Sequence, residues 1–175
     1  YRGAHHPKAK HVYRSGCLAL ERLRFLSARL GGGAAVLDIG SGSGEWLYIL
    51  SKAGHFPMGV ELDPAYAEFA RQEYGVEVLT SSALDLEIPE ERFDCVTIFH
   101  VVEHLPDPIA ALTRLRRRLK PGGFMVVEVP NMSSRHQNPA KRFHYAHVIG
   151  FTPESFARVV RKSGLELVDL SFSSY

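Results

Sequence analysis

The sequence predicts a doubly wound α/β fold, in which helices cover both faces of a mostly parallel sheet. Short, nearly continuous apolar runs, typical of strands buried on both faces, alternate along the chain with longer amphipathic segments. Apolar residues make up 45% and charged residues 23% of the 175 positions, a globular composition that excludes a disordered chain. No segment approaches the roughly 20 consecutive apolar residues that span a bilayer.

The predicted elements follow one another in a regular order. Leucines at helical spacing predict a first helix over 12–30, which three consecutive glycines end. Later helices are bounded by glycine or proline, as by Pro64 and Gly75, and are expected at 45–53, 64–74, 109–119 and 153–163. Apolar runs between the helices predict six strands, at 34–39, 56–62, 76–80, 93–99, 124–129 and 165–172.

Basic residues are unevenly distributed along a chain whose net charge is +2. Residues 1–20 and 129–153 hold lysines and arginines but no acidic residue. This asymmetry favours an anionic partner, although solvated loops and termini would explain it as well. We divide the chain into a basic N-terminal segment with a cap helix, 1–33, and a core domain, 34–175.

A glycine-rich loop follows the first predicted strand, where the sequence VLDIGSGSG occupies residues 36–44. Glycine lets the chain turn and lets a ligand approach the backbone at the start of a helix. The GxGxG spacing is one residue shorter than the dinucleotide fingerprint, which would need glycine where Glu45 stands, and no Lys-Ser/Thr pair follows as in a P-loop. Glu61 ends the second strand, 21 residues after Gly40, where a carboxylate can accept both ribose hydroxyls of a nucleoside.

These segments resemble the first two motifs of the class I S-adenosylmethionine (SAM)-dependent methyltransferases, which have a Rossmann-like fold. The resemblance continues through FDCVTIFHVVEHLPDP, RLKPGGFMVVEVPN and GFTPESFARVVRKSGLELV and covers most of residues 34–171. Within that class, the sequence is similar to the ubiquinone-pathway O-methyltransferases and the type 11–23 methyltransferase domains. The resemblance implies seven strands, the last one antiparallel and beside the sixth. We predict only six, so we expect an excerpt that stops one strand short.

The resemblance also implies which residues bind SAM, the product being S-adenosylhomocysteine. Asp38 would orient the loop and the cofactor's amino group, Glu61 would hold the ribose, and Leu62 would pack against the adenine. Ser82 stands where the family has an acid that accepts a hydrogen bond from the adenine amine. The expected cofactor-binding residues are Asp38, Gly40, Ser41, Gly42, Gly44, Glu61, Leu62, Ser82, Ala83 and His100.

Histidines follow the fourth predicted strand, at the expected mouth of the pocket. Methyl transfer to a hydroxyl needs a base when the acceptor must lose a proton near neutral pH, and histidine suits that task. We expect His104 to be the catalytic base, with His100 as second candidate, although a helix-start histidine bonded to backbone remains an alternative for His104.

A metal site is an alternative use of the same residues. Some family members, including small-RNA 2′-O-methyltransferases, bind a divalent metal through Glu-x-x-Glu-His and a later histidine. Here Glu103, His104 and His147 match, but His100 replaces the first glutamate, so we expect no metal and keep these three residues as the alternative set.

The polar segment 131–147 follows the fifth strand and is a candidate acceptor site. We expect Arg135, Arg142, His144 and His147 to contact an anionic acceptor. The basic run 114–120 lies on a helix without interleaved aromatic residues, which indicates a solvated surface and argues against nucleic acid.

We therefore expect a SAM-dependent methyltransferase that acts on a small, anionic acceptor at oxygen. The rival hypotheses are an RNA 2′-O-methyltransferase with a metal at the histidines and a non-catalytic domain that keeps the fold. Cys17 and Cys95 stand in apolar contexts without CxxC spacing, which favours small buried residues in the reducing cytoplasm. The sequence leaves the oligomeric state open.

Overall fold

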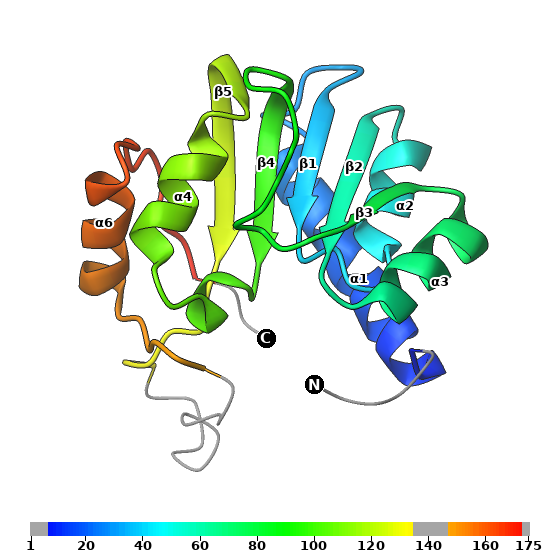
Figure 1. The fold of residues 1–175 in the computed structure, drawn as a ribbon, viewed down its shortest axis with the longest axis horizontal. Helices are drawn as coiled ribbons and strands as arrows, with labels where there is room; N and C mark the ends of the chain where they lie inside the picture. Colours follow the sequence, from blue (N-terminus) through cyan, green and yellow to red (C-terminus); the bar gives the residue numbers. More distant parts are fainter. Residues whose placement is uncertain (1–6, 135–146, 173–175) are drawn as a thin grey trace.

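The computed structural model describes residues 7–134 and 147–172. Within these ranges five parallel strands form one sheet in the order β3-β2-β1-β4-β5 (Figure 1). The strands are β1 (Ala35–Ile39), β2 (Phe56–Glu61), β3 (Glu77–Thr80), β4 (Phe93–Phe99) and β5 (Leu119–Glu128). The helices are α1 (Ala9–Leu26), α2 (Glu45–Lys52), α3 (Pro64–Tyr74), the short 3-10 helix η1 (Val102–His104), α4 (Pro108–Arg116) and α6 (Pro153–Lys162).

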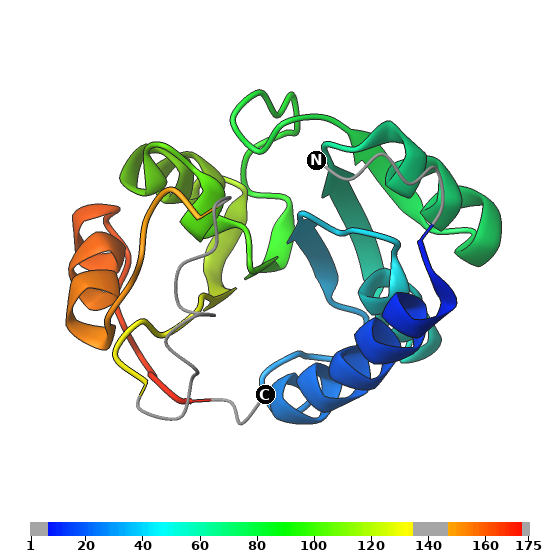
Figure 2. The ribbon, with the colours of Figure 1, turned by 90° about the horizontal axis from the view of Figure 1, so that it is seen from below.

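Helices pack on both faces of the sheet, as the doubly wound prediction requires (Figure 2). On one face, Leu26 of α1 and Trp46 of α2 join a buried cluster with Val36 of β1. On the other face, Leu112 of α4 and Phe156 of α6 pack with residues of the central strands. Successive side chains of a strand point to opposite faces of the sheet, and helices cover both faces here. Nearly every position of a central strand is therefore buried, which is why the apolar runs are continuous.

Three helices begin at caps that the sequence encodes locally. The side chains of Asp63 and Asp107 accept hydrogen bonds from backbone N–H groups in the first turns of α3 and α4, each of which has proline at its start. At α6, Thr152 and Ser155 exchange hydrogen bonds in a capping box. These caps fix where each helix leaves its preceding loop.

The prediction of a sixth strand at 165–172 is wrong. Leu165 and Leu167 pack against the core while Glu166 and Val168 are exposed, so residues 165–168 have the alternation of a strand, but residues 169–172 are all exposed. None of the described residues, however, pairs with it in the sheet. Alternation reports only which side chains are buried, whereas a strand also needs a neighbour that accepts and donates backbone hydrogen bonds.

Two boundaries and one cysteine also differ from expectation. The first helix spans Ala9–Leu26 rather than 12–30, and β5 begins at Leu119, which pairs with Phe93 ahead of the Pro-Gly-Gly turn expected to precede the strand. Cys17 is exposed because two residues turn an α-helix through about 200°, which places it opposite the buried Ala19. Cys95 is buried, as expected.

The basic run lies on an exposed surface, as predicted, and three of its arginines also hold neighbouring loops. The guanidinium of Arg114 donates to the carbonyl of Leu84, and that of Arg118 donates to the carbonyl of Leu86 at 3.2 Å, so both hold the loop after β3. Arg116 donates instead to the carbonyl of Gly164 after α6. In the described part of the chain, no helix is both long and apolar enough to cross a membrane.

Candidate functional site

The predicted site residues lie where the strand order reverses, at the carboxyl ends of β1 and β4. The chain leaves β1 toward β2 on one side and leaves β4 toward β5 on the other, so the two following loops flank a crevice. The loops touch at one point, where a Cβ added to Gly40 would lie 2.3 Å from Cγ2 of Val101. The glycine loop and the histidine segment therefore belong to one site.

The three glycines of the loop are needed for different reasons. All three have positive φ, at +75° for Gly40, +54° for Gly42 and +89° for Gly44. A Cβ on Gly44 would lie 2.6 Å from Cβ of Ala70, so this glycine lets α2 pack against α3. A Cβ on Gly42 would meet nothing within 4 Å. Of the three, only Gly42 faces open space into which a ligand could come close to the backbone.

Asp38 is a buried carboxylate at the base of the loop. Its Oδ1 accepts a hydrogen bond of 2.6 Å from the hydroxyl of Thr97, its register partner on β4. Burial raises the pKa of Asp38 to about 7, although the Thr97 hydrogen bond and the charge of Arg22 lower it. Asp38 therefore titrates near neutral pH, and a nearby cation would favour its ionised form.

Glu61 connects the end of β2 to the glycine loop. Its two carboxylate oxygens accept backbone hydrogen bonds, one of 2.7 Å from Gly42 and the other of 2.9 Å from Asp63. The hydroxyl of Ser41 is buried and has no hydrogen-bond partner among the residues that the structure describes. A buried hydroxyl without a partner is uncommon, and a polar ligand in the loop would satisfy it.

Two residues expected near an adenine ring occupy different environments. Leu62 is 53% exposed just after β2, so its side chain is open to a ligand. The hydroxyl oxygen of Ser82 accepts a hydrogen bond of 3.1 Å from the backbone of Leu84 and so fixes the turn that carries Ala83. One acceptor site of Ser82 is thereby used within the loop.

His100 lies between two carboxylates, which argues against its use as a base. Its Nε2 is 3.0 Å from Glu128 Oε1 and its Nδ1 is 3.5 Å from Glu103 Oε1. These carboxylates raise the pKa of His100 to about 9, so the ring is protonated at neutral pH and has no free lone pair for a proton. Although burial raises the pKa of Glu128, the hydrogen bond from His100 and the charge of Arg22 leave it below its usual value. Arg22 of α1 reaches this group and donates to Glu128 at 2.9 Å.

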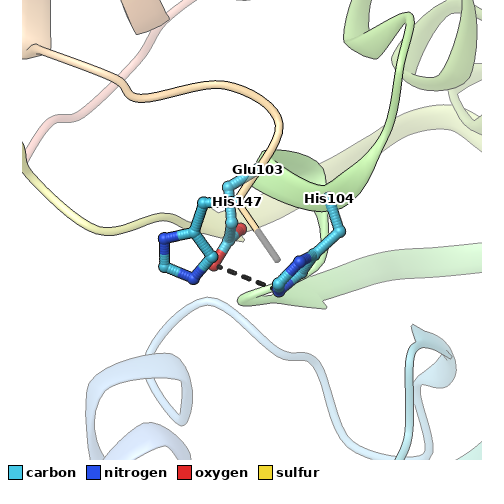
Figure 3. A group of neighbouring side chains, drawn as sticks. All are labelled: Glu103, His104 and His147. Carbon is cyan, nitrogen blue, oxygen red and sulfur yellow. Dashed lines mark ion pairs between the residues drawn. The ribbon is translucent and has the colours of Figure 1, made fainter. Parts of the chain in front are cut away.

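Glu103, His104 and His147 form a second cluster of neighbouring side chains (Figure 3). One ligand atom of each lies within 4.8 Å of the others, although His147 is 43 positions from His104 in the sequence. His147 is brought in because the backbone N–H groups of Val148 and Ile149 both donate to the carbonyl of Glu103. Both carboxylate oxygens of Glu103 are buried without a hydrogen-bond partner among the described residues, and Oε1 lies 4.0 Å from His104 Nε2.

The remaining expected acceptor residues, Arg135, Arg142 and His144, lie outside the described residues. The two ends of their segment meet, because Asn131 forms a parallel bridge with Phe151. Asn131 and Phe151 thus lie side by side, and Val148 and Ile149 contact η1.

The sequence interpretation missed Thr97, Arg22 and Glu128. Thr97 had a detectable signal, since it is a polar residue among the apolar residues CVTIF at the centre of a strand predicted to be buried. Arg22 and Glu128 carry no such signal, because their pairing joins residues 106 positions apart.

Comparison with known proteins places this site in context. A family model described as a methyltransferase domain matches residues 10–170. The ubiquinone biosynthesis O-methyltransferase of Cereibacter sphaeroides is 34% identical over 176 residues, covering 87% of this chain and 68% of that protein. The protein of the same name from Xanthomonas axonopodis pv. citri is 32% identical, covering 88% and 72%. The crystal structure of a SAM-dependent methyltransferase from Archaeoglobus fulgidus superimposes with a TM-score of 0.73 at 28% identity, over 85% of this chain and 68% of that one.

Proposed function

The chain belongs to the class I SAM-dependent methyltransferases, and we propose that it transfers the methyl group of SAM to an oxygen atom of a small, anionic acceptor. The observation that carries the oxygen assignment is His104 beside the buried carboxylate of Glu103 at the end of β4. The names of the two relatives, which are O-methyltransferases, support the same assignment.

The cofactor is SAM, and the residues around the glycine loop suit it. SAM carries an ammonium group and a sulfonium, and Asp38 offers a buried carboxylate whose ionised form a cation would favour. The buried hydroxyl of Ser41 and the open space at Gly42 indicate that a polar ligand fits against the loop. We assign the cofactor to Asp38, Gly40, Ser41, Gly42, Gly44, Glu61, Leu62, Ser82 and Ala83, with His100 at its rim.

The protein's part in the reaction is to position the acceptor and remove its proton. SAM supplies the methyl group: the carbon–sulfur bond breaks as a carbon–oxygen bond forms, which leaves S-adenosylhomocysteine. His104 would accept the proton of the acceptor hydroxyl. The carboxylate of Glu103, 4.0 Å away, would stabilise the imidazolium that results. His100, paired with Glu103 and Glu128, is protonated at neutral pH and takes no part in this proton transfer.

A panel of acceptors tests the atom and the charge. We expect S-adenosylhomocysteine to form at least tenfold faster with dihydroxybenzoate than with aminobenzoate, because His104 would activate a hydroxyl. The methyl ester of dihydroxybenzoate should have a higher KM than the acid, because it lacks the anion. Faster turnover of the amine would overturn the oxygen assignment.

Arg142 tests which residues recognise the anion, together with Arg135, His144 and His147. Arg142→Glu should raise the KM for the acid at least tenfold and leave S-adenosylhomocysteine affinity unchanged. Arg117→Glu, at the exposed residue that follows α4, is the matched control. If the two variants behave alike, Arg142 does not contact the acceptor.

A second candidate is metal-assisted transfer, which the buried carboxylate of Glu103 beside two imidazoles favours. Glu103, His104 and His147 offer one carboxylate and two imidazoles, a donor set suited to a transition metal. A metal held there would lower the pKa of the acceptor hydroxyl, and His104 would then be a ligand rather than the base.

Titration of chelator-treated protein with Co²⁺ separates the two candidates. If the metal candidate is right, one ion binds, Glu103→Gln and His147→Ala each weaken its binding at least tenfold, and chelation abolishes activity. His11→Ala, which removes an exposed histidine of α1, is the matched control. Unchanged activity in chelator and no bound ion would exclude the metal and leave His104 as the base.

A further inference from the structure

A chain of three buried polar side chains lies behind the cofactor loop and joins α2, β4 and β1. The indole Nε1 of Trp46 donates to the hydroxyl oxygen of Thr97 at 3.2 Å. Thr97 in turn donates to Oδ1 of Asp38 at 2.6 Å. All three residues are less than 5% exposed, so water does not compete for these hydrogen bonds.

The direction of the chain follows from the donors and acceptors. An indole N–H can only donate, so it occupies an acceptor site of the Thr97 oxygen. The hydroxyl proton of Thr97 must then point to an acceptor, for which Asp38 at 2.6 Å and the carbonyl of Leu37 at 3.5 Å compete. The shorter contact, to a charged acceptor, is the stronger one.

We infer that Thr97, held by Trp46, is a positioning residue that keeps the carboxylate of Asp38 oriented and charged for the ammonium group of SAM. The inference rests on the proposed cofactor site, in which Asp38 meets that ammonium group. It gives a use to the polar residue of β4 and to the tryptophan of α2, neither of which the proposed reaction requires.

Groups on several elements of the fold raise or lower the pKa of Asp38. Burial raises its pKa to about 7, and the negative charge of Glu61 on β2 acts in the same direction. The Thr97 hydrogen bond and the charge of Arg22 on α1 oppose them. Cys95, also on β4, stays a neutral thiol because burial and the charge of Asp38 raise its pKa to about 12. Loss of the Thr97 hydroxyl therefore raises the pKa of Asp38 further and weakens cofactor binding at neutral pH.

Calorimetric titration with S-adenosylhomocysteine between pH 6 and 9 tests the inference. In the wild type, affinity should fall about tenfold from pH 8 to pH 6, because a carboxyl group of pKa near 7 must lose its proton to bind the ammonium group. Thr97→Val should move this transition upward by about one pH unit and so lower affinity about fivefold at pH 7. Thr97→Ser should restore the wild-type profile. Thr113→Val is the matched control, because it removes a threonine hydroxyl that donates to Ile109 on α4.

The outcomes separate this inference from the proposed site. If Asp38→Asn binds as tightly as the wild type and with the same pH profile, the assignment of Asp38 is wrong. If Asp38→Asn loses the pH dependence but Thr97→Val keeps the wild-type profile, the role of Thr97 is overturned. Trp46 is the only tryptophan, so its fluorescence in the wild type gives a readout that needs no variant. Its emission should titrate with the same midpoint as the affinity, and an emission independent of pH would also contradict the role of Thr97.

Discussion

Replacing Glu61 with glutamine should lower the affinity for S-adenosylhomocysteine about a hundredfold. Both carboxylate oxygens of Glu61 accept backbone N–H groups, from Gly42 and Asp63, so the group must accept hydrogen bonds on both sides. An amide accepts on one side only and would place its NH₂ against a backbone N–H. The variant would also lose charge-assisted hydrogen bonds to the ribose hydroxyls, each of which contributes about 1.5–3 kcal/mol.

Glu77→Gln is the control for this substitution, because it makes the same change at an exposed residue that begins β3. Calorimetry should give an unchanged affinity for Glu77→Gln, and thermal unfolding should separate lost binding from lost stability in Glu61→Gln. Wild-type affinity in Glu61→Gln would remove Glu61 from the cofactor site.

The largest loss of stability is expected from Gly44→Ala. At φ +89° an alanine is strained, and its Cβ would lie 2.6 Å from Cβ and 3.3 Å from Cα of Ala70. Because the backbone of α3 cannot move away as a flexible side chain would, strain and overpacking should together lower the free energy of unfolding by about 3 kcal/mol. Denaturant unfolding measures this difference.

Gly42→Ala is the matched variant, two residues earlier in the same loop. Its Cβ would meet nothing within 4 Å, so the cost in stability should be only about 1 kcal/mol, from the positive φ of +54°. The added methyl group would instead point into the open space assigned to the cofactor and should lower S-adenosylhomocysteine affinity at least tenfold. If Gly42→Ala binds normally, the ligand does not approach the backbone there.

Much of the fold was predictable because the signals were local. The apolar runs that became β1 to β5 and the glycine and proline boundaries of α2, α3 and α6 depend on residues close together in the sequence. The same holds for the glycine loop, one of the segments that carry the resemblance to the family. Cys17 was misjudged because its apolar neighbours in the sequence lie on the opposite side of α1.

The residues of the candidate site were largely predictable from the sequence, but the protonation state of His100 was not. The sequence indicated His100 and His104 as candidate bases. In the structure, Glu103 and Glu128 lie beside His100 and raise its pKa to about 9, so His100 is protonated at neutral pH. Glu128 is 28 positions from His100, and no local pattern relates the two.

By itself, the sequence determined the order of helices and strands, the doubly wound class and membership in the methyltransferase family. Only the tertiary structure decided that 165–172 forms no strand, that Asp38 accepts a hydrogen bond from Thr97, and that His147 lies near Glu103. The physical reason is that periodicity and turn residues report the environment of one segment at a time. Pairing of strands, hydrogen bonds between distant side chains and the resulting pKa values depend on distances that exist only once the chain has folded.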